Sequence, residues 1–227
     1  MCAVRQSMNT PIINHESPLL LSKTAHTRRV KGGARSYHHG DLRASLITAA
    51  REALETTAHE DISLKQLASH LGVSQPAPYR HFADREDLLR AVATQGFQEF
   101  CAELAPASGI SARRDFTKAC DEYLSFAQRN RGLYRLMFAS RLSRDSAGTE
   151  LSKVGNDAFS LLLHRVRRCI GAEGAQVNAV WIWSTLHGLA MLDAEQITAG
   201  PLASQVTSGQ VVRRMVNSLM GKRAPRD

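Results

Sequence analysis

A short run of residues between positions 75 and 80 has side chains of the kinds that read DNA bases. The amide of Gln75 can pair with adenine through two hydrogen bonds, and Ala77 can pack on a thymine methyl group. Arg80 lies one helical turn beyond Ala77 and can reach a base edge or a phosphate. Such contacts need a narrow rod that is open to solvent, so the flanking elements must present this run as a short helix.

The residues before this run are typical of a helix that ends in a tight turn. Ser63 is a candidate N-cap, and Gln66 three positions later completes the pattern of a capping box. Gly72 can adopt the positive φ that stops such a helix. Apolar residues between them recur at helical spacing, at Leu64, Leu67, Ala68 and Leu71.

Two further helices are predicted to follow, with Ser74 and Asp84 as their N-caps. Pro76 falls in the first turn, where its missing N–H has no effect. Pro78 falls where an N–H would close that turn, so this helix is expected to begin tight or one residue late. Its apolar face consists of Tyr79 and Phe82. The pattern indicates a helix-turn-helix, although an ordinary helical hairpin has the same spacing.

The segment from about 37 to 100 resembles the N-terminal domain of TetR-type repressors. The resemblance depends on the run Leu71-Gly72-Val73-Ser74 followed by Tyr79-x-His81-Phe82. It implies that Tyr79 and His81 contact phosphate, although Tyr79 can instead seal the domain core and His81 can cap it. We therefore expect eight residues to contact DNA, namely Ser63, Ser74, Gln75, Ala77, Tyr79, Arg80, His81 and Arg85.

The charge of the chain agrees with a polyanionic partner. The 227 residues carry a formal net charge of +8, and the pI is about 9.7. Residues 1–36 are polar and aperiodic, and we expect them to be a disordered basic arm. This arm would strengthen DNA binding through counterion release, or it is only a solvated tail. Its basic cluster consists of Arg28, Arg29, Lys31 and Arg35.

Signals for metal or enzyme chemistry are weak. The sequence His38-His39-Gly40-Asp41 lacks a third ligand at a recognisable spacing, so no metal site is expected. No Ser-His-Asp set, phosphate loop or paired carboxylate stands out, so we expect neither an enzyme nor a cofactor.

The cysteines and the hydropathy indicate a protein of the cytoplasm without a membrane partner. No apolar stretch is long enough to span a bilayer or to act as a signal peptide. The cysteines show no Cys-x-x-Cys spacing and are interpreted as reduced thiols rather than redox sensors. They are Cys2, Cys101, Cys120 and Cys169.

The remaining pattern predicts an all-α fold, since no alternating run indicates strands. A first helix is expected after Asp41. The later helices are expected over 85–104, 112–129, 131–142, 148–170, 175–197 and 203–220. We therefore expect a three-helix DNA-binding domain over 37–104 and a helical regulatory and dimerisation domain over 112–221.

The helix over 175–197 is the most apolar part of the chain. A helix that is apolar on nearly every side is buried on nearly every side, which predicts a subunit interface as well as a core. One of its faces carries Trp181, Ser184, Gly188 and Leu192, and the small residues would admit a second helix. The last two helices would then join a twin in a four-helix bundle, as a homodimer.

A dimer would hold two recognition helices about 34–36 Å apart, so the operator should be a near-palindrome of double-stranded DNA. The pattern Trp183-x-x-x-His187-Gly188 resembles a TetR subgroup named for its Trp-His-Gly signature.

The resemblance also implies a small lipophilic effector that releases the repressor from DNA by favouring the non-binding state. Residues expected to contact this effector are Phe116, Tyr123, Tyr134, Phe138, Trp183 and His187. They could line an apolar cavity, although plain core packing is the alternative for each of them. The rival functions are a protein-interaction module that keeps the fold, a ligand-independent regulator and, last, an enzyme.

Overall fold

The computed structural model describes residues 41–106, 109–139, 148–194 and 206–221. Within these ranges every regular element is a helix, and no strand occurs, as the sequence pattern predicts. The α-helices are α1 (Leu42–Ala53), α2 (Leu64–His70), α3 (Arg85–Glu103), α4 (Ala112–Arg129), α5 (Arg131–Ala139), α7 (Glu150–Ile170), α8 (Ala175–Ala194) and α9 (Ser208–Gly221). Two short 3₁₀ helices complete the set, η1 (His59–Asp61) and η2 (Pro78–Arg80).

Side-chain caps fix where several helices begin. The Asp41 carboxylate accepts a hydrogen bond of 3.0 Å from the Ala44 N–H, and Asp84 accepts one of 2.8 Å from Asp87. Both caps confirm the sequence prediction. The capping box expected at Ser63 is wrong, because Ser63 holds the N-cap position of α2 but its hydroxyl makes no capping hydrogen bond.

The turn after α2 has the predicted geometry. Gly72 has a φ of +69°, which a residue with a side chain adopts only at a cost. The Val73 N–H donates to the Ala68 carbonyl, and the Gly72 N–H donates to the Ser69 carbonyl. This pair of bonds is the Schellman arrangement that terminates helices.

The α-helix expected after Ser74 does not form. The chain makes a turn over residues 75–77 and then the 3₁₀ helix η2, so Ser74 caps no α-helix. Pro78 is the physical reason, because it has no N–H to donate to the Ser74 carbonyl. The Ala77 N–H bonds that carbonyl instead, at 2.9 Å, which tightens the segment to 3₁₀ geometry.

The later helices begin and end close to the predicted positions. Helix α4 has the expected bounds, and α3 ends one residue early. Helix α9 begins at Ser208, whereas the sequence predicted a start at 203. The prediction is wrong for residues 206 and 207, which are not helical. Residues 203–205 lie outside the described residues. The ends predicted at 142 and 197 also fall outside the described residues.

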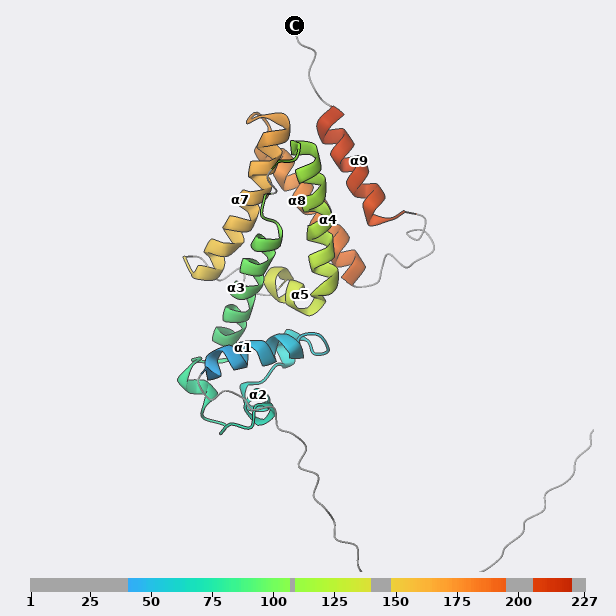
Figure 1. Cartoon of the computed structure of the whole chain (residues 1–227). Coiled ribbons are helices and arrows are strands. Elements are labelled where there is room, and N and C mark those ends of the chain that lie inside the picture. Colours follow the sequence, from blue (N-terminus) through green and yellow to red (C-terminus); the bar gives the residue numbers. More distant parts are fainter. Residues whose placement is uncertain (1–40, 107–108, 140–147, 195–205, 222–227) are drawn as a thin grey trace, which may run out of the picture. The chain divides into compact units, whose positions relative to one another are not determined.

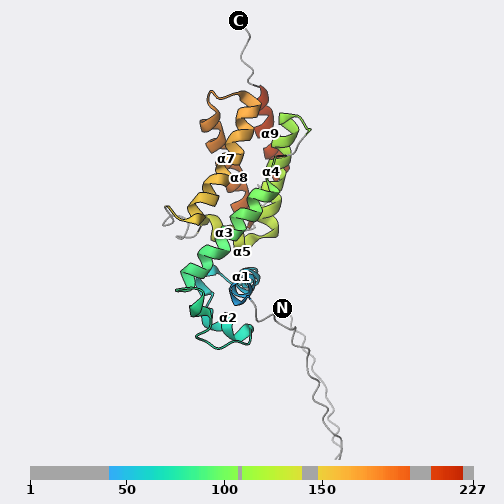
Figure 2. The ribbon, with the colours of Figure 1, turned by 60° about the vertical axis from the view of Figure 1, so that its left-hand side comes forward.

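Helix α3 connects the two groups of helices (Figures 1 and 2). Its first turns pack on α1, and the rest of its length packs on α5 and α7. Helices α4, α7, α8 and α9 pack against one another beyond it. The buried apolar residues of both groups form one continuous cluster, which includes Leu46 of α1, Phe97 of α3 and Ile182 of α8. The division into domains at about residue 104 therefore stays a prediction from sequence.

Candidate functional site

The segment from Ser74 to His81 is presented to solvent. Gln75, Arg80 and His81 are exposed, and the Tyr79 ring is 48% exposed although it is large and aromatic. The opposite side of the segment is anchored, since Pro78 is buried and Phe82 is 2% exposed. A short rod with a buried side and an exposed polar side is the arrangement that the sequence predicts, in 3₁₀ rather than α form.

Six of the eight residues expected to contact DNA lie in this segment, and Ser63 and Arg85 lie outside it. Five of the eight are exposed, namely Ser74, Gln75, Tyr79, Arg80 and His81. Three are half-buried, namely Ser63, Ala77 and Arg85. The Arg85 guanidinium donates to the Glu60 carbonyl of η1, which holds this side chain against the preceding loop.

Arg43 is a neighbour of the rod that sequence reasoning missed. Its guanidinium carbon lies 5.3 Å from the centre of the Phe82 ring, a cation–π contact that keeps a positive charge beside the segment. Helical spacing along α1 places Arg43 off the buried stripe, but the stripe does not reveal which distant ring the residue meets.

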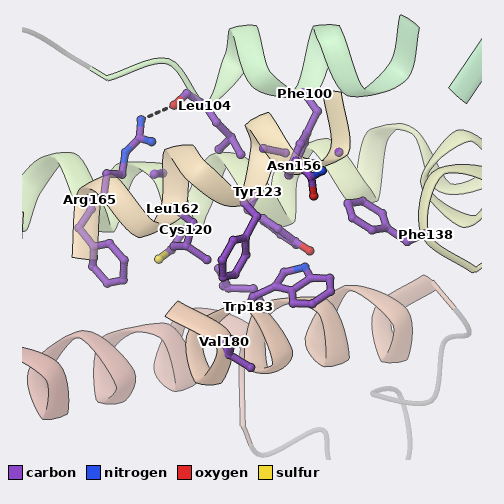
Figure 3. Close-up of a pocket in the computed structure, with 16 residues that line it drawn as sticks. Phe100, Leu104, Cys120, Tyr123, Phe138, Asn156, Leu162, Arg165, Val180 and Trp183 are labelled. Atoms are coloured by element: carbon purple, nitrogen blue, oxygen red, sulfur yellow. Dashed lines mark hydrogen bonds between the residues drawn. The ribbon is translucent and has the colours of Figure 1, made fainter. Parts of the chain in front are cut away.

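A cavity of about 310 Å³ lies between the helices (Figure 3). Its walls come from α3, α4, α5, α7 and α8, and most of its lining is apolar. The aromatic members of the lining are Phe100, Phe116, Tyr123, Phe138, Phe159 and Trp183. Its volume is at the low end of the range of roughly 300–1,000 Å³ that is usual for ligand pockets.

Four of the six residues expected at an effector site line this cavity, namely Phe116, Tyr123, Phe138 and Trp183. Tyr134 and His187 do not line it and lie behind its wall in a chain of hydrogen bonds. The Tyr123 and Tyr134 hydroxyls are 2.8 Å apart, and the Tyr134 hydroxyl is 2.7 Å from Nδ1 of His187.

Burial keeps the three hydrogen-bonded side chains, Tyr123, Tyr134 and His187, uncharged. It raises the pKa of the Tyr123 phenol, against hydrogen bonds from Tyr134 and Trp183 that lower it. It also raises the pKa of Tyr134, with a further contribution from Tyr123. Desolvation lowers the pKa of His187, so its imidazole is neutral at neutral pH. The histidine is therefore satisfied by a tyrosine hydroxyl instead of the backbone carbonyl that is usual in a core.

A buried ion pair closes one end of the cavity. Arg165 lines the cavity and is 2% exposed, and its Nε lies 3.5 Å from a carboxylate oxygen of the equally buried Asp115. The Arg165 guanidinium also donates to the carbonyls of Leu104 and Leu161 (Figure 3 shows the first). Arg168 donates to the same Asp115 oxygen at 2.9 Å from a half-exposed position.

Sequence reasoning missed Arg165 and Asn156 as lining residues. An arginine and an asparagine on an amphipathic helix are normally assigned to solvent. The apolar stripe of α7 does indicate that Arg165 faces the core. Arg165 falls within this stripe, whose apolar residues recur at helical spacing, at Ala158, Phe159, Leu162 and Val166.

No described residue covers the face of α8 that was expected at a subunit interface. Val177 is 75% exposed, Trp181 42% and Leu192 42%, which is unusual for large apolar side chains. Ser184 on the same face is exposed, and a side-chain carbon added to Gly188 would meet no atom within 4 Å.

Other kinds of site are not found in the described ranges. Within them no group of three or more His, Cys, Asp or Glu side chains is arranged to hold a metal, and His38 and His39 lie outside them. Cys101, Cys120 and Cys169 are free thiols, and Cys2 lies outside the described residues. No helix in the part of the chain that the structure describes has the length and apolar character to cross a membrane.

Two family models together match most of the described residues. The model of bacterial regulatory proteins of the tetR family matches residues 46–92, which include α1, α2 and the exposed rod. The model of the tetracycline repressor-like C-terminal domain matches residues 116–219, which include most of the cavity wall and the uncovered face of α8. The chain belongs to the TetR family. It is therefore a DNA-binding transcriptional regulator, and the Trp-His-Gly subgroup is not confirmed by these matches.

Solved structures of this TetR-family regulator's relatives show the same fold. A Rhodococcus protein of unknown function is 30% identical, with 83% of this chain and 98% of that chain covered and a TM-score of 0.68. A TetR variant from Acinetobacter baumannii in complex with minocycline is 17% identical, with 82% and 96% covered and a TM-score of 0.58. BioQ with its double-stranded DNA operator is 17% identical, with 78% and 97% covered and a TM-score of 0.57. Among curated proteins, no sequence matches this chain.

Proposed function

We propose that this TetR-family regulator is a homodimeric repressor of the cytoplasm that leaves a near-palindromic operator when a small molecule fills its cavity. The observation that carries the proposal is the exposed polar rod from Ser74 to His81 within the segment that matches the family's DNA-binding model. BioQ, which has this fold, binds a double-stranded operator.

The rod supports groove entry through its exposed side chains. The Gln75 amide has a donor and an acceptor for an adenine edge, and Ala77 offers a methyl group to thymine. Tyr79, Arg80 and His81 are also exposed and carry groups that hydrogen-bond phosphate oxygens. The 3₁₀ form makes the rod short, so few bases are read by each subunit and a second copy is needed for affinity.

The uncovered face of α8 supports dimerisation with a second copy of this chain. Burial of exposed Val177, Trp181 and Leu192 would remove apolar area from water, at roughly 25 cal/mol per Å². Ser184 and the open space above Gly188 allow a partner helix to approach closely. With α9 beside α8, the pair forms half of the proposed four-helix bundle.

Helix α5 supports communication between cavity and rod. Phe138 on α5 lines the cavity, and Gly132 at the start of the same helix packs against the end of α1. Arg51 of α1 bonds Glu99 of α3 at 2.5 Å and Asn130, just before α5, at 3.1 Å. A molecule that moves Phe138 would thus move the contact on which α1 rests, and this shifts the population away from the DNA-binding arrangement.

Gel-shift binding to DNA from the region upstream of the gene tests the proposal. Gln75→Ala should weaken binding by about 1–3 kcal/mol through loss of a base contact. The matched control is Gln98→Ala, an exposed glutamine of α3 away from the rod, which should leave binding unchanged. Equal affinity of the two variants, or binding that does not weaken with added salt, would favour the rival interaction module that keeps the fold.

A further inference from the structure

The described residues that line the cavity offer no negative charge to a ligand. Arg165 is the one formally charged side chain among them, and none of them is a carboxylate. Asp115, the nearest buried acid, is already shared by Arg165 and Arg168. Burial also raises the pKa of the lining thiol Cys120 to about 12, so this group is uncharged. A cation placed here would be desolvated beside a guanidinium, without a counter-ion.

An anion is disfavoured for a different reason. Arg165 is 2% exposed and already has Asp115 as its ion-pair partner, together with two backbone carbonyls. A buried ligand carboxylate would therefore have to displace Asp115, which Arg168 would still hold, or one of the two carbonyls, or else stay unpaired. An unpaired buried charge is costly, so the cavity selects against both signs of charge.

The polar groups that remain available are neutral. The Tyr123 hydroxyl has one donor and two acceptor positions, and Tyr134 and Trp183 use two of these three. The third position is left for a ligand. It is a donor or an acceptor, depending on which way the hydroxyl protons point in the hydrogen bonds from Tyr123 through Tyr134 to His187. The Asn156 side chain is exposed to solvent, makes no hydrogen bond to another described residue, and lines the cavity near Tyr123 and Trp183 (Figure 3).

The rest of the lining favours flat rings. Six aromatic side chains from five helices surround the space, and aromatic rings prefer edge or offset contacts with other rings. From these constraints, and resting on the proposed function, we propose that the effector is an uncharged molecule of one or two aromatic rings. We further propose that it carries a hydroxyl or primary amide, which meets Tyr123 and Asn156.

Calorimetric titration of the full chain with matched probes tests this class. One set has a naphthalene ring with a carboxamide, a carboxylate or a methylammonium group, and the second set has the same three groups on biphenyl. The carboxamide should bind at least about tenfold more tightly than either charged probe of the same set, because only the charged groups lose hydration without a partner. A charged probe that binds as tightly as its amide, or two amides that do not bind, would overturn the proposal.

Two variants locate the contact. Asn156→Leu should weaken carboxamide binding about fivefold, a usual size for loss of one hydrogen bond, and leave binding of unsubstituted naphthalene unchanged. The matched control is Asn178→Leu on α8, outside the cavity, which should change neither. Equal effects of both variants would contradict the assignment of Asn156. Operator binding without any probe is measured in parallel, so a chain that binds DNA but not the amides refutes only the ligand class.

Discussion

Gly132 at the start of α5 packs directly on the backbone of Leu54 at the end of α1. A side-chain carbon at position 132 would lie 1.9 Å from the Leu54 carbonyl oxygen and 2.6 Å from its carbonyl carbon. Because these are backbone atoms, they cannot move aside as a flexible side chain would. The element that carries part of the cavity wall is thus in van der Waals contact with the first helix of the DNA-binding segment.

Gly132→Ala is therefore expected to destabilise the protein and to weaken its binding to DNA. The added methyl group must push α1 and α5 apart, at about 1–3 kcal/mol of unfolding free energy, measured by urea titration. The control Gly209→Ala adds a carbon whose nearest neighbours lie at 3.9 Å, so it should be neutral or slightly stabilising. If folded Gly132→Ala binds the operator as tightly as the original chain, α5 does not couple the cavity to the rod.

The Asp115 carboxylate is expected to be essential for stability. Asp115→Asn keeps the shape but leaves the buried Arg165 guanidinium without an anion, which should cost about 3–5 kcal/mol in urea unfolding. Asp157→Asn on the exposed side of α7 should change stability by less than about 0.5 kcal/mol. Asp115→Leu combined with Arg165→Met should recover most of the loss, and failure to do so would mean that the pair contributes through packing.

His187 predicts a loss of stability in mild acid. Desolvation lowers its pKa in the folded state, so the unfolded chain takes up a proton at a higher pH than the folded chain. Stability should then be fully present above the unfolded value of about 6.5 and decrease as the pH falls below it. Melting temperatures between pH 8 and 5 measure this.

His187→Gln should flatten the dependence of the melting temperature on pH, since glutamine does not titrate. His164→Gln, at an exposed histidine of α7, should leave the dependence as it is. Parallel curves for the original chain and His187→Gln would show that burial does not disfavour protonation of the imidazole.

The uncovered face of α8 predicts the oligomeric state. Val177→Asp places a charge on the most exposed large apolar side chain of the proposed interface, which should convert a dimer into a monomer in sedimentation velocity. Ser160→Asp, at an exposed position of α7, is the control and should remain dimeric. A dimer that persists in Val177→Asp would place the interface elsewhere.

Local signals in the sequence predicted the elements that local physics determines. Asp41 and Asp84 are identifiable as caps because a capping bond joins residues three positions apart. Gly72 is identifiable because the turn that ends α2 needs a positive φ. The bounds of α4 agree with the range expected from helical spacing alone.

The sequence could not predict features that depend on distant partners or on a missing donor. Pro78 predicted a helix that begins tight or one residue late, but the sequence did not show that the missing N–H would leave the 3₁₀ helix η2 in place of an α-helix. Arg165 is buried only because Asp115, fifty residues earlier on another helix, lies beside it. The position of His187 likewise depends on a distant partner, Tyr134. The sequence predicted Tyr134 as a ligand contact, but the residue lies behind the cavity wall and bonds His187 there.

Selection of bound fragments from genomic DNA, followed by footprinting, tests the central claim most directly. The account predicts one family of near-palindromes whose half-sites are separated by about 34–36 Å along the duplex, or a multiple of a helical turn, with protection lost in Gln75→Ala. Recovery of no common sequence, or of an asymmetric single site that Gln75→Ala protects equally well, would contradict it.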